Sequence, residues 1–273
     1  MGMDDLELDR GPTPPAGPPA ADDARWKWII AGAVALALVG GGVARWWTMD
    51  RAAPTAPEAA PAAAASTDVP LATSEPELPP LDQMDGFLRA LLGTLSTRPE
   101  LARWLATDNL VRQMALIIDR VASGDTPAKD LALLAPDDEF GVRGRGRSRT
   151  IDPASYRRYD GIAETIATLD AEAVARVYRT IRPRLNEAYR AMGRTTSDVD
   201  QALLAALDVL IATPVPKGSV RIVEGRGATW AFADPELESL EPAQKQLLRM
   251  GPENAARIIE KLKDVKARIQ QPE

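Results

Sequence analysis

The chain has 273 residues, and its composition excludes several kinds of chemistry before any motif is considered. It contains no histidine and no cysteine, which excludes disulfides, thiolate nucleophiles, zinc–thiolate sites and histidine-based catalytic triads. The net charge of −6 comes entirely from the first 77 residues, with 11 acidic and 5 basic side chains, because residues 78–273 carry 28 of each. A neutral domain lacks the basic excess of a general nucleic-acid binder, so no nucleic-acid partner is expected, and no motif for a metal or cofactor is found.

Residues 26–47 are predicted to form a single transmembrane helix. A charge-free run of 17 residues, WIIAGAVALALVGGGVA, lies between Lys27 and Arg45. At about 1.5 Å per residue it covers about 25 Å, and tryptophans at both ends suit the headgroup level. An uncut anchor is favoured over a cleavable signal peptide because 27 residues precede the run. Small residues spaced four apart leave a homodimer of such helices as an alternative: Ala33, Ala37 and Gly41.

The flanking segments predict which side of the membrane the C-terminal part occupies. Basic residues lie on both sides of the run, so the positive-inside rule alone does not decide. However, residues 52–88 contain no lysine or arginine, as expected for a segment that crosses. The N-terminus is therefore expected inside and the C-terminal domain outside. Residues 1–25 are predicted to be a disordered tail, and residues 48–77 an extended Ala/Pro-rich linker.

Residues 78–273 are predicted to form a mainly helical domain. Apolar residues recur with the 3.6-residue period of amphipathic helices. Helix starts are predicted at Asp82, Pro99, Thr107 or Asp108, Asp152-Pro153, Asp170, the Ser197/Asp200 capping box, Pro242 and Pro252. Pro183 is expected to kink or split the helix that follows Asp170.

Two segments are predicted to be strands instead. Residues 219–224 and 228–233 partly alternate around Gly225-Arg226-Gly227, which predicts a β-hairpin. A second hairpin is expected over residues 140–151, around Gly144-Arg145-Gly146. The predicted fold class is therefore mainly α, a helical domain with one or two small β-hairpins, preceded by a single transmembrane helix.

Four alternating arginines are the best candidate for a binding site: Arg143, Arg145, Arg147 and Arg149. On one strand all four would project from the same face and concentrate positive charge, which would suit an anionic partner. The alternative is a solvated hairpin edge whose charges discourage aggregation.

Tyrosines and aspartates are weaker candidates. An aromatic groove is conceivable, but helical spacing favours packing in the core for Tyr156, Tyr159, Tyr178 and Tyr189. A pair of carboxylates for glycoside hydrolysis is also conceivable. Capping is the simpler explanation for most of the aspartates concerned: Asp152, Asp160, Asp170, Asp198 and Asp234. No catalytic residue is assigned. The sequence suggests no structural role for Asn254, in the segment MGPEN.

The strings IDPASYRRYDGI, FADPELESL and especially QKQLLRMGPENAARI resemble the bacterial, envelope-associated family known as domain of unknown function 3014. The likeness covers residues 78–269. The family pairs one N-terminal membrane helix with this domain, so the resemblance implies the same layout. With the orientation expected from the flanking charges, the helix would lie in the bacterial inner membrane and the domain in the periplasm. It implies no activity, cofactor or catalytic residue.

Taken together, these patterns favour a membrane-tethered binding or scaffolding module that recognises a protein or an anionic envelope component. Whether the domain is an enzyme is left open, with binding favoured over catalysis. The alternatives are an envelope hydrolase that uses acidic residues only, and an adaptor that faces the cytoplasm.

Overall fold

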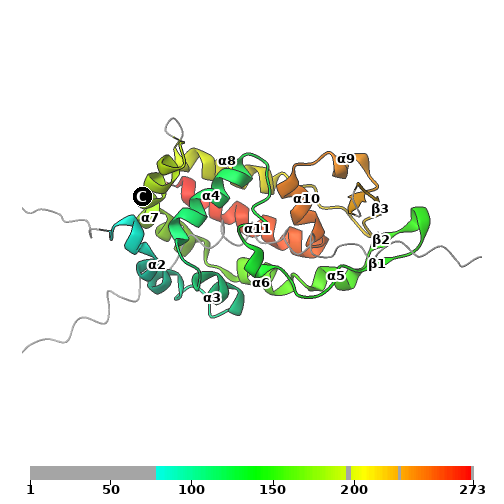
Figure 1. Ribbon diagram of the computed structural model, residues 1–273, viewed down its shortest axis with the longest axis horizontal. Helices are drawn as coiled ribbons and strands as arrows, with labels where there is room; N and C mark the ends of the chain where they lie inside the picture. The colour runs from blue at the N-terminus through cyan, green and yellow to red at the C-terminus, as the bar shows by residue number, and fades with distance from the viewer. Residues whose placement is uncertain (1–77, 195–197, 227–228, 272–273) are drawn as a thin grey trace, which may run out of the picture.

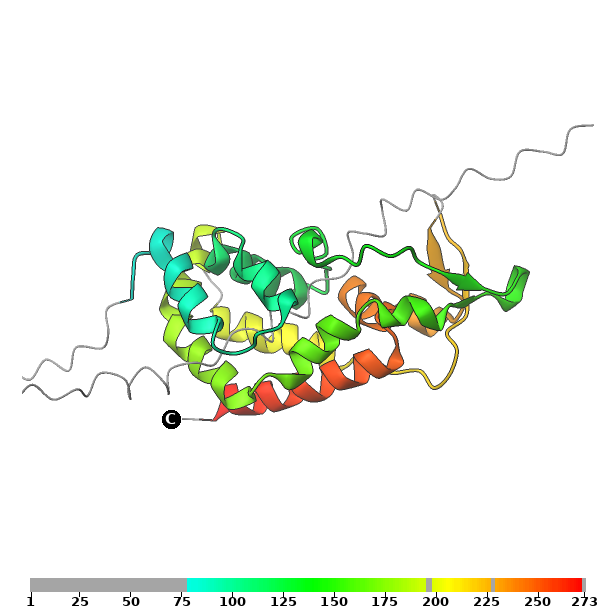
Figure 2. The ribbon, with the colours of Figure 1, turned by 90° about the horizontal axis from the view of Figure 1, so that it is seen from below.

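The computed structural model describes residues 78–194, 198–226 and 229–271, which form an elongated, mainly helical domain (Figures 1 and 2). The longer helices are α2 (Met84–Leu92), α3 (Pro99–Leu105), α4 (Leu110–Ala122), α6 (Asp160–Thr168), α7 (Ala171–Ala191), α8 (Val199–Ile211), α10 (Pro242–Arg249) and α11 (Pro252–Gln270). Shorter elements are α5 (Pro153–Arg157), α9 (Pro235–Glu238), and the 3-10 turns η3 (Leu81–Gln83), η4 (Ala132–Leu134) and η5 (Gly146–Ser148). The strands are β1 (Val142–Arg143), β2 (Thr150–Ile151), β3 (Ile222–Glu224) and β4 (Trp230–Phe232).

The prediction of a mainly helical domain with one or two small hairpins is confirmed, and two hairpins are present. The predicted N-terminal tail, transmembrane helix and linker lie outside the described residues. Among the helices that are described, none has both the length and the apolar character needed to cross a bilayer.

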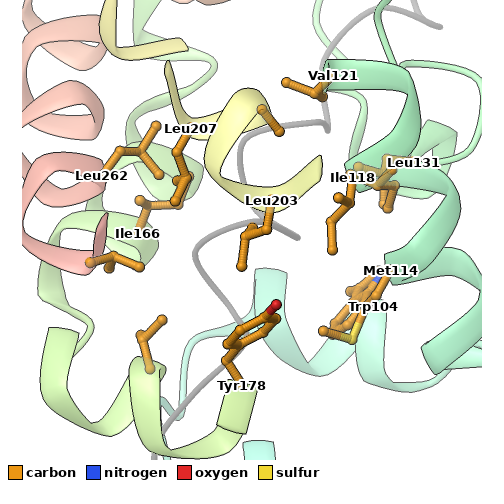
Figure 3. Packing of buried hydrophobic residues seen from close by; sticks show 14 of the residues in the cluster. Trp104, Met114, Ile118, Val121, Leu131, Ile166, Tyr178, Leu203, Leu207 and Leu262 are labelled. Atoms are coloured by element: carbon orange, nitrogen blue, oxygen red, sulfur yellow. The ribbon is translucent and has the colours of Figure 1, made fainter. Parts of the chain in front are cut away.

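The main core lies where α4, α7, α8 and α11 meet. The helix α4 packs against α7 and α8, while α11 packs against α6, α7 and α8. Figure 3 shows side chains from these helices converging, among them the buried Met114, Leu203 and Leu262. Burying one such side chain contributes roughly 1.5–3 kcal/mol relative to leaving it in water. Tyr178 lies in the same core, so the amphipathic periods seen in the sequence do mark buried faces.

Aspartates begin several of the helices. The carboxylates of Asp152 and Asp170 accept the backbone N–H two residues on, at 2.8 and 3.0 Å, which confirms both predicted caps. Asp198 caps α8 in the same way at 3.2 Å, so it takes the role expected of Ser197, which lies outside the described residues. Asp234 caps the short α9 at 2.9 Å, a helix that the sequence did not predict.

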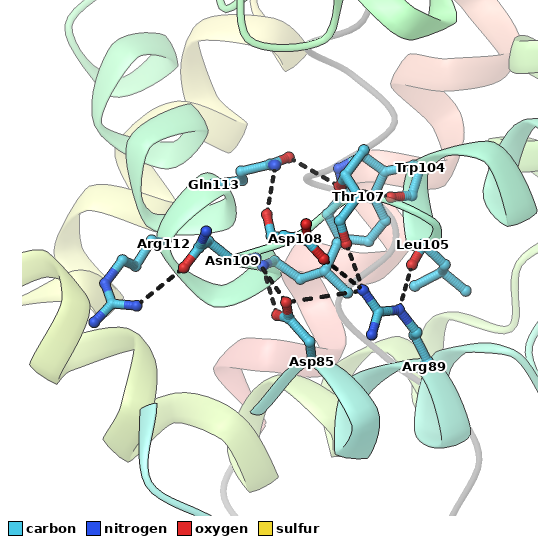
Figure 4. Close-up of polar contacts among 10 residues, drawn as sticks. Asp85, Arg89, Trp104, Leu105, Thr107, Asp108, Asn109, Arg112 and Gln113 are labelled. Carbon is cyan, nitrogen blue, oxygen red and sulfur yellow. Dashed lines mark hydrogen bonds and ion pairs between the residues drawn. The ribbon is translucent and has the colours of Figure 1, made fainter. Parts of the chain in front are cut away.

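The start of α4 is capped from another helix, which corrects the prediction of Thr107 or Asp108 as its cap. Asn109 precedes α4 in the left-handed conformation, at φ 59°. The carboxylate of Asp85, on α2, accepts the backbone N–H groups of Asn109 at 2.7 Å and of Leu110 at 2.9 Å (Figure 4). One turn further along α2, Arg89 donates to the carbonyl of Leu105, at the end of α3, at 2.7 Å. Two side chains of α2 therefore hold the α3–α4 connection.

The predicted cap Asp82 has a different role. It lies in η3, outside α2, and its carboxylate pairs instead with Arg112 of α4 at 2.7 Å. The helix α2 begins at Met84 without a side-chain cap.

The longest of the described helices, α7, holds both ends of the described chain. Pro183 was expected to kink or split this helix, and the split does not occur, because α7 runs without a break from Ala171 to Ala191. Arg184 donates to the carbonyls of Leu78 and Pro79, each at 2.8 Å. Arg179 donates to the carbonyl of Arg268, near the end of α11, at 2.7 Å. The first and last described residues consequently lie at the same end of the domain, opposite the hairpins (Figures 1 and 2).

At the other end, the two hairpins join and cover a second, smaller core. β1 pairs with β2 and β3 pairs with β4, all antiparallel. Thr150 of β2 also bridges Arg221, just before β3, which links the hairpins in the order β1-β2-β3-β4. One face of this joined sheet packs on Leu248 of α10 through Ile151, Val220, Ile222 and Phe232.

The segment MGPEN forms a joint between the two cores. Gly251 has φ 98°, and a Cβ on it would lie 2.6 Å from Cγ of the Tyr156 ring, so glycine is required both by conformation and by space. The buried Asn254 amide donates to the carbonyls of Tyr156 and Met250, each at 3.1 Å, and to the carboxylate of Asp160 at 2.9 Å. The α10–α11 junction is thereby held against the junction of α5 and α6, which gives Asn254 the structural reason that the sequence did not reveal.

Replacing Asp85 by alanine should lower the free energy of unfolding by about 1–2 kcal/mol, because two backbone donors at the start of α4 lose their acceptor. Asp82→Ala is the matched control. That carboxylate is exposed and makes only a surface pair, so its loss should cost less than about 0.5 kcal/mol. Denaturant titration of both variants measures the difference, and equal losses would contradict the assignment of Asp85 as the cap.

Gly251→Ala should destabilise the domain by roughly 2–5 kcal/mol, because a strained backbone and a clash with the Tyr156 ring add together. Gly193, at φ 86°, has no atom within 4 Å of its notional Cβ. Gly193→Ala should therefore cost only the backbone strain, roughly 1 kcal/mol. Thermal or denaturant unfolding compares the two, and a Gly251→Ala variant as stable as Gly193→Ala would refute the close approach.

Candidate functional site

The candidate site is the turn between β1 and β2, named here the arginine tip and defined as residues 143–149. It projects at the end of the domain opposite α2 (Figures 1 and 2). Gly144 has φ 84°, and a Cβ there would lie 2.6 Å from the carbonyl oxygen of Ser148. The Ser148 hydroxyl donates to the carbonyl of Arg145 at 2.8 Å and closes the turn.

The strand register decides which face of the joined sheet each side chain occupies. Arg143 pairs with Thr150, and Thr150 bridges Arg221. Directly opposed residues in neighbouring strands point to the same face, so these three form one row across the sheet. Ile151 and Ile222 lie in the adjacent rows and point into the small core. The row that contains Arg143 and Arg221 therefore lies on the opposite face from the core.

The expectation that all four arginines share one face of a single strand was wrong. The chain turns through η5 at Gly146–Ser148, so Arg143 lies on one strand of a hairpin and Arg149 immediately precedes the other. Because Arg143 is opposite Thr150, the neighbouring Arg149 points to the other face.

The outer two arginines are engaged within the domain. Arg143 pairs with the Asp152 carboxylate at 3.0 Å. The Ala154 backbone N–H and this guanidinium together hold the Asp152 pKa below its usual value. Arg149 pairs with Glu224, and its guanidinium lies 5.2 Å from the centre of the Trp230 ring. Both arginines help to fasten the tip to the sheet.

The inner arginines and Arg221 are available for a ligand. Arg145, Arg147 and Arg221 are exposed, and within the described residues their side chains make no hydrogen bond or ion pair. The two hairpin segments, residues 140–152 and 217–226, together contain 7 basic and 2 acidic side chains in a domain that is neutral as a whole. The site is therefore a local concentration of positive charge, which is the property that an anionic partner would recognise.

The four tyrosines pack into the domain, as their helical spacing favoured, and do not form an aromatic groove. Tyr159, Tyr178 and Tyr189 are buried, and Tyr156 is half-buried. Burial raises the pKa of Tyr156 and of Tyr159 to about 12. The Tyr178 hydroxyl donates to Asp200 of α8, and the Tyr189 hydroxyl donates to Asp119 of α4 at 3.2 Å. The pKa values of both phenols are also raised, chiefly by burial.

The aspartates proposed as an alternative catalytic pair have other partners. Asp152, Asp170, Asp198 and Asp234 cap helices, and Asp160 accepts a hydrogen bond from Asn254. In the described ranges, acidic side chains do not gather in groups of three or more that could hold a metal ion.

Arg221 is the member of the site that the sequence did not indicate. It lies within a predicted strand, yet its place beside Thr150 depends on a bridge between segments far apart in the chain. The alternation Val220-Arg221-Ile222 was a sufficient signal that Arg221 points away from the core. It was not a signal that Arg221 adjoins the arginine tip.

The fold and site define an elongated helical domain with a basic hairpin end. Residues 110–266, more than half of the chain, match the model of a family described as "Protein of unknown function (DUF3014)". The chain therefore belongs to this family, which confirms the resemblance seen in the sequence. The match begins at α4 and includes the arginine tip, the joined sheet and the Gly251 joint. No curated protein and no solved structure matched the chain.

Proposed function

We propose that this protein is a non-enzymatic binding module, tethered to the bacterial inner membrane, whose C-terminal domain faces the periplasm and binds an anionic protein or envelope component through the arginine tip. The observation that carries the proposal is the position of Arg145 and Arg147. Both are exposed and unpaired within the described residues, at the end of the domain opposite the point where the chain enters it.

The sequence supports the tether. The apolar run in residues 26–47 has the composition of a membrane span, and residues 52–88 lack the lysine and arginine that would oppose translocation. The chain enters the domain at Leu78, which Arg184 holds at 2.8 Å. A tether attached there leaves the arginine tip at the far end, where it can meet a partner away from the tethering point.

Binding suits the domain better than hydrolysis. A glycosidase needs two carboxylates about 5–9.5 Å apart around its substrate. The aspartates that could have supplied them serve as helix caps or hold Asn254. Guanidinium groups, by contrast, bind carboxylates and phosphates with paired hydrogen bonds and need no further group for recognition.

Arg145→Glu with Arg147→Glu should weaken binding of the full-length protein to an immobilised polyanion such as polyglutamate. The expected loss is on the order of tenfold, because each exposed ion pair is worth up to about 1 kcal/mol. The matched control is Arg103→Glu with Arg190→Glu, which reverses two exposed charges on α3 and α7. Equal losses in both double variants would show that only overall charge matters, and would remove the arginine tip from the proposal.

Two fusions after Glu273 test the location of the C-terminal domain. A reporter that works only in the periplasm should be active, and a reporter that works only in the cytosol should be silent. This outcome is expected because residues 52–88 carry no positive charge. Activity of the cytosolic reporter alone would refute the periplasmic location and favour an adaptor that faces the cytoplasm.

A further inference from the structure

The face of the joined sheet that points away from the small core carries both a positive charge and an exposed apolar side chain. It carries Arg221, and two residues later Val223, whose side chain is 38% exposed. Val223 is one of four large hydrophobic side chains that are exposed in the described part of the chain. Residues two apart on a strand point to the same face and lie about 7 Å apart. A cation and an apolar side chain are therefore adjacent on this face.

This face meets the arginine tip at Arg143. Thr150 separates Arg221 from Arg143 in the row across the sheet, and Arg145 and Arg147 follow in the turn. Neighbouring strands lie about 4.8 Å apart, so the row from Arg143 to Arg221 is about 10 Å wide. This width suits a segment of polypeptide that lies across the strands.

Other parts of the sheet are already occupied. At the edge formed by β4, the Phe232 backbone N–H donates to Glu238 of α9 at 2.8 Å. The opposite face packs on Leu248. The acidic helix α9 lies beside β4, so negative and positive charges are separated across the width of the sheet. On the face opposite the small core, Arg221 and Val223 are exposed in the described part of the chain, so this face is open to a partner.

We infer that this face, together with the arginine tip, binds an acidic protein segment that also presents an apolar side chain. The inference rests on the proposed function and narrows its ligand to a protein. Carboxylates of the partner pair with Arg145, Arg147 and Arg221, and an apolar side chain covers Val223. A free polyanion would use the arginines but would gain nothing from Val223.

The test uses the full-length protein and two synthetic peptides, one of glutamates and leucines and one in which each leucine is replaced by serine. The wild-type protein should bind the leucine peptide about 5–10 times more tightly, because apolar surface is buried against Val223. Val223→Ser should abolish that preference. Val215→Ser, at an equally exposed valine in the loop after α8, should leave it intact. Arg221→Glu should weaken both peptides, and Arg103→Glu neither.

Inorganic polyphosphate and vesicles that contain phosphatidylglycerol serve as the alternative ligands. If these bind while both peptides bind equally weakly, or if Val223→Ser has no effect on the peptides, the inference is overturned and anion binding at the arginine tip still stands. If neither the peptides nor the polyanions bind, both the inference and the proposed function fall. Thermal melting of Val223→Ser and Val215→Ser confirms that each variant is folded.

Discussion

The close approach of Gly251 to Tyr156 is the constraint on which the arrangement of the two cores depends. It brings the α10–α11 junction against α5, and the Asn254 amide then ties that junction to the carbonyl of Tyr156 on α5 and to the carboxylate of Asp160 on α6. The helix α11 belongs to the main core, whereas α10 supplies Leu248 to the small one. Since the sheet rests on α10, this joint also sets the direction in which the hairpins leave the helical body. The buried side-chain N–H groups of Asn254 are paired with acceptors, which suits them to this role, because leaving them unpaired would be costly.

The interactions that hold the domain also give it two different ends. At one end, Arg179 and Arg184 are engaged by backbone carbonyls of the chain's first and last described segments. At the other end, Arg143 and Arg149 are engaged by carboxylates that fasten the hairpin. Arg145 and Arg147, which lie between them in the chain, make no such contacts within the described residues. A domain that is neutral overall therefore presents a basic end, and charge balance computed over the whole sequence conceals this.

The sequence predicted those features whose causes are local. Asp152 and Asp170 cap their helices through the backbone two residues on, so the residue type and the following apolar period were enough. The cap of α4 was missed because its acceptor, Asp85, lies 24 residues from the donor at Asn109. Both hairpins were predicted from turn residues and alternation, but their joining was not, since Arg149 and Glu224 meet across 75 residues. The arginines were assigned to one face for a different reason, which is local. The alternating pattern does not show that the chain turns at Gly146–Ser148, so that Arg143 and Arg149 lie on the two sides of a hairpin.

The alternative reading of the arginines, as charges that protect a sheet edge, accounts for only part of the pattern. Edge protection concerns strands whose backbone groups would otherwise pair with another chain. That reason applies to Arg143, which lies on the outer strand β1. It does not apply to Arg145 and Arg147, which lie in a turn, or to Arg221, which is bridged to Thr150 on one side and whose carbonyl accepts the N–H of Ala233 at 3.0 Å on the other. Folding requires Gly144 at the tip, but within the described residues it makes no use of the guanidinium groups of Arg145 and Arg147. The three arginines that neither folding nor edge protection explains are the three on which binding is proposed to depend.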